Sequence, residues 1–148
     1  MQVLFILFGS LFLYRGIGAA GLAVGLAAFA TWIGAARAAL ATMLAFTAAA
    51  HFTPTRRDLI AMVPPGLPRP DLLVATTGVA EAAGAVLLLL PATREPAAYG
   101  LILLFALMLP ANISAARRHL TLRGRPATAL WLRVPMQLLF IAWAWAVR

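Results

Sequence analysis

Four long apolar runs constrain the fold of this chain more than any other feature of its sequence. They extend over about Ala35–Phe52, Asp71–Leu90, Ala97–Ala116 and Leu130–Val147. An apolar helix of roughly 17 to 25 residues crosses the ~30 Å hydrocarbon core of a bilayer, so each run predicts a transmembrane helix. Segments that contain proline and arginine separate the runs, and prolines placed in this way end helices.

The composition favours a membrane protein over a soluble domain. Of the 148 residues, 64% are hydrophobic and only 11% are charged, and the mean hydropathy is +0.94. A soluble domain has nearer half apolar and a quarter charged residues. We therefore predict an all-α fold, a polytopic membrane helical bundle with four core transmembrane helices.

The first 34 residues predict one extra N-terminal transmembrane helix. A span near Val3–Leu22, followed by a connector rich in glycine and alanine at Gly25–Gly34, is favoured, and a span at Ile17–Ile33 is the alternative. The start of the chain resembles the apolar region of a signal peptide, but no positive charge precedes it, so we expect a retained span. The predicted organisation is an additional span and connector at 1–34 and a four-helix bundle at 35–148.

Arginine determines the predicted orientation. The net charge is +8, and the basic residues are all arginines. The breaks at 53–70 and 117–126 hold three and four arginines, whereas the break after Leu90 holds Arg94 beside Glu95. Because cytoplasmic loops of membrane proteins are enriched in arginine and lysine, we expect both arginine-rich loops in the cytoplasm. The predicted protein crosses the plasma membrane several times, with the lipid bilayer as its surroundings.

Several kinds of chemistry are disfavoured because the sequence lacks the residues that they require. The sequence has no cysteine, which excludes disulfides, thiolate metal sites and iron–sulfur ligation by this chain. Two histidines and four acidic residues leave few catalytic or metal-ligating constellations, so we predict no catalytic residues and no metal site. The arginines lie between apolar runs without interleaved aromatic residues, so nucleic acid is not an expected partner.

Five polar or ionisable residues fall inside or at the ends of the predicted core helices. They are His51, Glu81, Asn112, Arg133 and Gln137. Such residues are costly in a bilayer and usually face the interior of a bundle. Counted from the arginine-rich ends at a rise of about 1.5 Å per residue, all five lie in the same half of the membrane, with Glu81 deepest at roughly 15 Å.

This common depth predicts a ligand pocket that opens toward the cytoplasm. We expect a Glu81–Arg133 pair near its base, because an ionised carboxylate in a low-dielectric interior needs a partner. A polar network that only locks the helices together is the competing interpretation, and His51 by itself could simply end a span at the interface. Pro110 and Pro135 each free a carbonyl one turn earlier and could kink their helices.

The stretch HFTPTRRDLIAMVPPGLPRP, residues 51–70, follows the first core helix. Its apolar part, LIAMV, is too short to span a membrane and predicts a short helical turn at the interface. Pro64, Pro65 and Pro68 are then expected to hold the chain extended before the second core helix begins. The segment is predicted to cover the entrance to the Glu81 pocket as a lid. The alternative is that it only holds the ends of the two helices together.

Four sequence blocks resemble the DoxX-like family of small four-helix membrane proteins. They are HF followed by a basic stretch and MVPPGLP, then GVAEAAGAVLLLLPATR, LPANISAARR and LRVPMQ, in that order. The resemblance covers about Ala35–Trp145 and implies a four-helix antiparallel bundle, to which the N-terminal span is an addition. It also places on family motif positions the five polar residues and Pro64, Pro65, Pro68, Pro110 and Pro135.

Family members have been linked to thiosulfate–quinone oxidoreduction, to redox-stress complexes and to the assembly of receptor channels. The favoured hypothesis is an integral membrane accessory protein that binds a small amphipathic ligand, a quinone or a lipid headgroup, as a subunit of a membrane redox complex. The alternative is an assembly factor or chaperone that packs against other membrane proteins or a second copy through Gly21, Gly25, Gly78 and Gly84. A stand-alone enzyme is disfavoured, because no nucleophile–base pair or cofactor motif is present.

Overall fold

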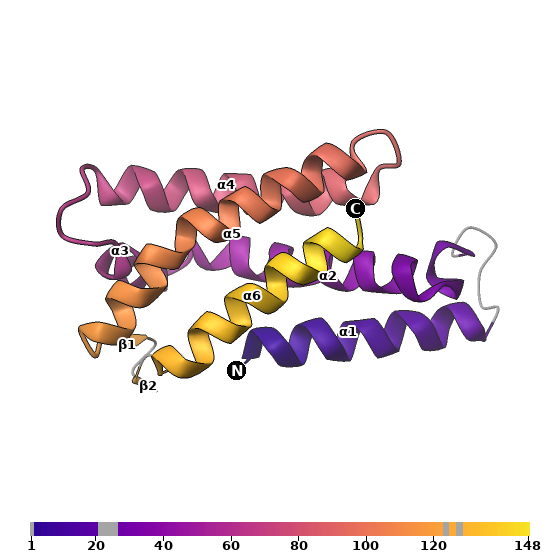
Figure 1. Cartoon of the computed structure of the whole chain (residues 1–148), viewed down its shortest axis with the longest axis horizontal. Helices are drawn as coiled ribbons and strands as arrows, with labels where there is room; N and C mark the ends of the chain where they lie inside the picture. Colours follow the sequence, from indigo (N-terminus) through magenta and orange to yellow (C-terminus); the bar gives the residue numbers. More distant parts are fainter. Residues whose placement is uncertain (1, 21–26, 123–124, 127–128) are drawn as a thin grey trace.

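The computed structural model describes residues 2–20, 27–122, 125–126 and 129–148, and this part of the chain is almost entirely helical (Figure 1). The elements in chain order are α1 (Gln2–Ala19), the 3-10 helix η1 (Ala27–Ala30), α2 (Trp32–Ala50), α3 (Arg56–Met62), α4 (Pro70–Leu89), α5 (Arg94–Arg117), β1 (Thr121–Leu122), β2 (Arg125–Pro126) and α6 (Leu130–Ala146). The two strands pair antiparallel, with Thr121 opposite Pro126. This small hairpin was not predicted, but the all-α class is confirmed.

Four helices, α1, α2, α4 and α5, are long and apolar enough to cross a membrane. The last helix, α6, is also apolar but has 17 residues. At 1.5 Å per residue it rises about 25 Å, close to the lower limit for a spanning helix. The four predicted core helices are thus present within a few residues of their expected bounds, and their lengths are consistent with a membrane protein.

Local sequence signals explain where the helices begin and end. The Thr31 hydroxyl accepts a hydrogen bond from the Gly34 backbone N–H at 3.0 Å and so caps α2. Pro70 occupies the first turn of α4, where its missing N–H costs nothing. In α5, Glu95 lies in the first turn and Arg117 in the last, which places each charge at the end of the helix dipole that stabilises it.

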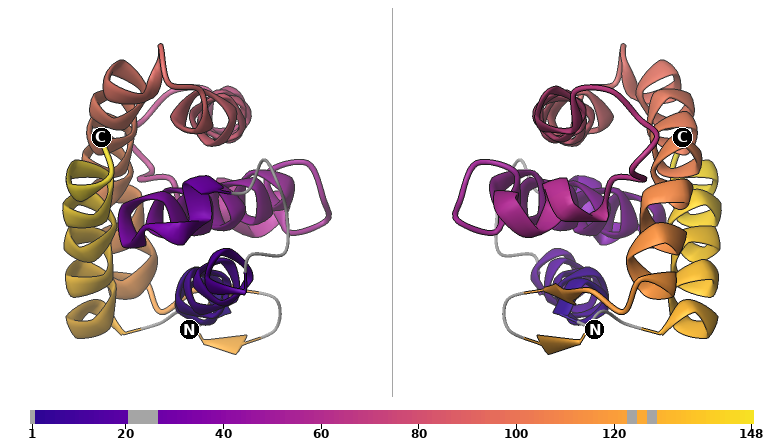
Figure 2. Two further views of the ribbon diagram at one scale, coloured as in Figure 1. Left: turned by 90° about the vertical axis from the view of Figure 1, so that its right-hand side faces the viewer. Right: turned by 90° about the vertical axis from the view of Figure 1, so that its left-hand side faces the viewer.

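The helices are arranged in two layers (Figure 2). One layer contains α1, α2 and α4 with α2 in the middle, and the other contains α5 and α6. The two layers meet through contacts of α4 with α5 and of α2 with α6. Because α2 touches α1, α4 and α6, it is the central helix, and most of its inward-facing positions are small residues or leucine.

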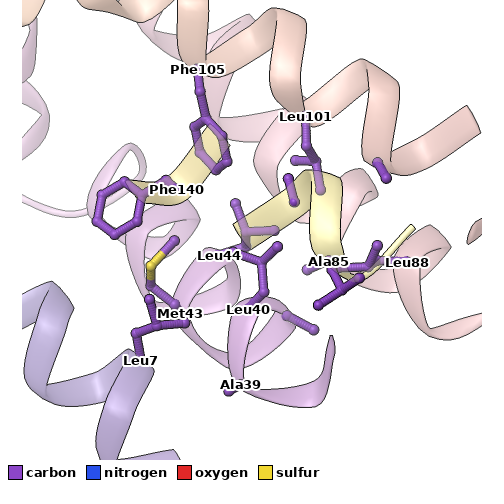
Figure 3. Packing of buried hydrophobic residues seen from close by; sticks show 14 residues of the cluster. Leu7, Ala39, Leu40, Met43, Leu44, Ala85, Leu88, Leu101, Phe105 and Phe140 are labelled. Atoms are coloured by element: carbon purple, nitrogen blue, oxygen red, sulfur yellow. The ribbon is translucent and has the colours of Figure 1, made fainter. Parts of the chain in front are cut away.

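Both layers contribute to one apolar core (Figure 3). Leu7 comes from α1, Leu44 from α2, Leu88 from α4, Phe105 from α5 and Phe140 from α6. The Phe105 and Phe140 rings lie 5.9 Å apart between their centroids. The extra N-terminal helix therefore shares its core with the four other long helices.

The two arginine-rich loops lie at the same end of the bundle, as the sequence predicted. Helix α3 and the β1–β2 hairpin are neighbours at one end, and the α4–α5 turn and the C-terminus lie toward the other (Figure 1). This arrangement follows from successive antiparallel long helices. Which side of a membrane this end faces stays a prediction.

The helices observed in the N-terminal region show which of the two predicted spans is present. α1 ends at Ala19, and Ala27–Ala30 form a separate 3-10 helix, so the alternative span at Ile17–Ile33 is wrong. The connector was predicted to continue to Gly34, but α2 already begins at Trp32 because Thr31 caps it. The glycines at positions 21 and 25 lie outside the described residues.

Candidate functional site

His51 and Glu81 form a buried pair between α2 and α4. His51 caps the C-terminus of α2, and Glu81 lies in the middle of α4. Their side chains are only 5% and 4% exposed, and 3.6 Å separates His51 Nε2 from Glu81 Oε2. The other ring nitrogen, Nδ1, lies 2.7 Å from the Val74 carbonyl oxygen, so the ring is held from both sides.

A glycine in α4 makes this approach of the two helices sterically feasible. A Cβ built at Gly78 would lie 2.5 Å from His51 Cβ and 2.7 Å from its Cγ. Val74, Gly78 and Glu81 are spaced i, i+4 and i+7, so they share one face of α4, and all three are buried. On the face of α4 that receives the imidazole, Gly78 therefore lies between the Val74 carbonyl and the Glu81 carboxylate.

Glu81 is incompletely satisfied at this position. Within the described structure its Oε2 atom is buried and makes no hydrogen bond, and the His51 ring nitrogen at 3.6 Å is too distant to count as one. A buried acceptor without a donor costs about 1–3 kcal/mol, and more when the group is charged. A carboxylate oxygen in this state is a candidate binding point for a donor that the chain itself does not supply.

A second polar cluster lies between α5 and α6. Arg133 Nη1 donates to Asn112 Oδ1 at 2.9 Å, and Asn112 Nδ2 donates to Gln137 Oε1 at 3.3 Å. The Gln137 amide in turn donates to the Phe105 carbonyl oxygen at 2.7 Å. Arg133 and Gln137 lie one turn apart on α6, so this chain of hydrogen bonds ties one face of α6 to α5.

The chain of hydrogen bonds ends next to the proline of α5. Pro110 lies inside this helix and cannot donate to the carbonyl of Ala106, one turn earlier. Gln137, from the neighbouring helix, donates to the adjacent carbonyl of Phe105. Gln137 thus bonds the carbonyl that precedes the one freed by Pro110.

The structure corrects the partners predicted for the five polar residues. Glu81 faces His51 on α2, whereas Arg133 contacts Asn112 on α5, so the expected Glu81–Arg133 pair is replaced by two separate clusters. The reason is helix rotation: α4 turns its Gly78 face toward α2, and α6 turns its polar face toward α5. The contacts of His51 with Thr77 and with the Val74 carbonyl were not predicted. The small and polar residues one turn from Gly78 on α4 were the sequence signal that could have indicated them.

The segment after His51 folds against the bundle. Helix α3 contacts α4, α5 and β1, and Arg118 at the end of α5 donates to the carbonyl oxygens of Ala61 and Val63. The predicted short helix is thus confirmed. The predicted extended course of Pro64, Pro65 and Pro68 is wrong in part, because the Leu67 N–H donates to the Pro64 carbonyl at 3.0 Å and closes a turn.

Ligation of a metal ion has no support in the described part of the chain. Three or more histidine or acidic side chains do not gather at one place within it. The two polar clusters instead offer buried or half-buried hydrogen-bonding groups, the kind of group that orients a small molecule inside an apolar bundle.

The arrangement described so far defines a class of protein, a bundle of long apolar helices with buried polar pairs between neighbouring helices. A family model described as a domain of unknown function, DUF8561, matches residues 40–148, and the chain belongs to this family. The match begins within α2, so α1 lies outside the matched region. No curated protein matches the chain, and no solved structure matches it. The resemblance to DoxX-like proteins is not tested by these comparisons.

Proposed function

We propose that the protein is an integral membrane binding protein that holds a small amphipathic molecule at the His51–Glu81 pair. One observation carries the proposal: Glu81 is 3% exposed, and its Oε2 atom has no hydrogen bond in the described structure. An apolar bundle with a few convergent polar groups is the usual form of a small-molecule site. The apolar helices around the pair would accommodate the hydrophobic part of such a ligand.

The orientation of the arginine-rich end supports a site near the cytoplasmic face of the plasma membrane. The 53–70 segment and the described part of the 117–126 segment lie together at one end of the bundle, and arginine-rich ends of membrane proteins are generally cytoplasmic. His51 immediately precedes the first of these segments. In this proposal, α3 and the turn at Pro64, Pro65 and Pro68 act as the lid, supported by the contacts of α3 with α4 and α5.

The ligand is proposed to be a quinone or a lipid headgroup, held on behalf of a membrane redox complex. The resemblance of the four sequence blocks to DoxX-like proteins supports the redox connection, by analogy alone. The second cluster, Asn112, Arg133 and Gln137, lies on a different helix pair, and we assign it the task of holding α6 against α5. We assign no reaction to either cluster.

An assembly factor that packs against other membrane proteins, or against a second copy, is the alternative proposal. Its support from sequence was a glycine-rich surface. Gly78 and Gly84 are buried inside the bundle, where a Cβ would meet His51 and Leu101 respectively, so neither is available to an outside partner. The ligand-binding proposal is therefore favoured.

The test is to purify the protein in lipid nanodiscs and identify the small molecules that accompany it by mass spectrometry. Glu81→Gln is compared with Glu95→Gln, which removes an exposed carboxylate at the start of α5. We expect a specific molecule in the wild type and in Glu95→Gln, and its loss from Glu81→Gln. Identical molecules in all three samples, or a stoichiometric protein partner in their place, would exclude the proposal.

A further inference from the structure

The hydrogen bonds of His51 determine which of its nitrogens carries a proton. Nδ1 lies 2.7 Å from the Val74 carbonyl oxygen, and a carbonyl can only accept, so Nδ1 carries a hydrogen. The Thr77 hydroxyl, 3.4 Å from Nδ1, lies 3.0 Å from the carbonyl oxygens of Leu73 and Val74, to which its own proton is directed. In a neutral ring of this tautomer, Nε2 presents a lone pair toward Glu81.

That lone pair cannot face an ionised carboxylate without a proton between them. Nε2 and Glu81 Oε2 are 3.6 Å apart and both groups are buried, so two acceptors would repel each other strongly in this low-dielectric interior. One proton must therefore reside on the pair, either on Nε2 or on Oε2. In both placements the pair as a whole is neutral, with one donor and one acceptor side by side.

We propose that this one-proton pair recognises a neutral hydroxyl group, an alcohol or a phenol at the polar end of an amphipathic molecule. A hydroxyl donates one hydrogen bond and accepts another, so a single oxygen complements the pair whichever member holds the proton. A phosphate has no donor when ionised, and a quaternary ammonium has none at all. The inference rests on the proposed function, and it narrows the ligand from a quinone or a lipid headgroup to a hydroxyl compound, a class that includes the reduced quinol and excludes the oxidised quinone, whose oxygens only accept.

The positioning residues for this recognition are Val74 and Gly78. The Val74 carbonyl fixes the tautomer of His51, and Gly78 admits the ring to its place on α4. Neither residue needs to touch the ligand. Their contribution is to hold Nε2 in front of Glu81, so that donor and acceptor stay within reach of one oxygen atom.

The experiment uses full-length protein in phosphatidylcholine nanodiscs with two added probes, 4-nonylphenol and its methyl ether. Retention is measured by mass spectrometry for the wild type, Glu81→Gln and Glu95→Gln. Since one hydrogen bond to such a pair is worth about a factor of ten, we expect the wild type to retain the phenol at least about tenfold better than the ether. Glu81→Gln should lose this preference, and Glu95→Gln should keep it. Diacylglycerol as a third probe distinguishes a lipid alcohol from a phenol.

A second measurement keeps the inference testable if Glu81→Gln fails to fold. Nitrogen-15 NMR of histidine-labelled wild type has the ring nitrogens of two histidines to assign, and His119, which lies exposed in the other arginine-rich segment, serves as an internal control. We expect His51 Nδ1 to be protonated, and the phenol to shift the Nε2 resonance of His51 alone. An unprotonated Nδ1 overturns the inference.

The remaining outcomes separate this inference from the proposed function. Equal retention of phenol and ether, or a bridging water that the phenol does not displace, overturns the hydroxyl assignment. If a different molecule accompanies the wild type and depends on Glu81, the proposed function stands while the inference fails. If nothing bound depends on Glu81, both fail.

Discussion

The imidazole of His51 packs directly on the backbone of Gly78. A Cβ at this glycine would lie 2.5 Å from His51 Cβ and 3.2 Å from Nδ1, so the glycine sets how closely α2 and α4 approach at the site. Glu81 follows one turn later on the same face and meets the far edge of the ring. The pair thus depends on a residue that carries no side chain.

Gly78→Ala is expected to destabilise the protein by about 1–3 kcal/mol, because the added methyl group overpacks a buried contact with the ring and with the end of α2. The midpoint of thermal unfolding in detergent, followed by circular dichroism, measures this change. Gly100→Ala is the matched control, since a Cβ there meets nothing within 4 Å on α5. Its midpoint should stay the same or rise slightly. Equal midpoints for the two variants would contradict the packing described.

Gln137→Leu is expected to cost about 1–3 kcal/mol, because it leaves the amide of Asn112 and the carbonyl of Phe105 without their partner at a buried position. The same unfolding midpoint measures the loss. Gln2→Leu makes the identical chemical change at an exposed position at the start of α1 and should have little effect. A Gln137→Leu variant as stable as the control would show that the second cluster does not hold α6 against α5.

Arg118→Gln is expected to loosen α3. The guanidinium donates to the carbonyl oxygens of Ala61 and Val63 and to the Ser114 hydroxyl, so it connects the end of α5 to the end of α3. Loss of about 1 kcal/mol from such bonds predicts a roughly fivefold faster amide exchange in α3. Hydrogen exchange with mass spectrometry reads this out, and Arg117→Gln, the exposed neighbour, is the control. Unchanged exchange in Arg118→Gln would mean that other contacts hold α3.

The natural absence of cysteine allows the orientation to be tested with single introduced thiols. We expect Arg57→Cys and His119→Cys to react with a membrane-impermeant maleimide from the same side of sealed vesicles. Ala92→Cys, in the α4–α5 turn at the other end of the bundle, should react from the opposite side. Opposite labelling of positions 57 and 119 would rule out the predicted arrangement, and labelling of both from outside the cell would reverse the membrane orientation.

Local sequence signals were enough to predict the helices. The length of an apolar run and the prolines between runs act over a few neighbouring residues, so the bounds of α2, α4, α5 and α6 could be predicted within a few residues, whereas the cap at Thr31, which starts α2 earlier than expected, was missed. The sequence also identified the five polar residues, because each is conspicuous in an apolar run. The N-terminal region left two alternatives, since its glycines and alanines give a weak pattern.

Which of these polar residues contact one another depends on the packing of the helices and could not be predicted. Depth along a helix follows from residue number, so the sequence could place each polar residue along its helix, with Glu81 near the middle of α4. The neighbour of a side chain depends also on how each helix is rotated about its axis, which is settled by packing of residues far apart in the sequence. Gly78 against His51 and Gln137 against Phe105 fix those rotations, and they give Glu81 a histidine on α2 instead of Arg133 on α6.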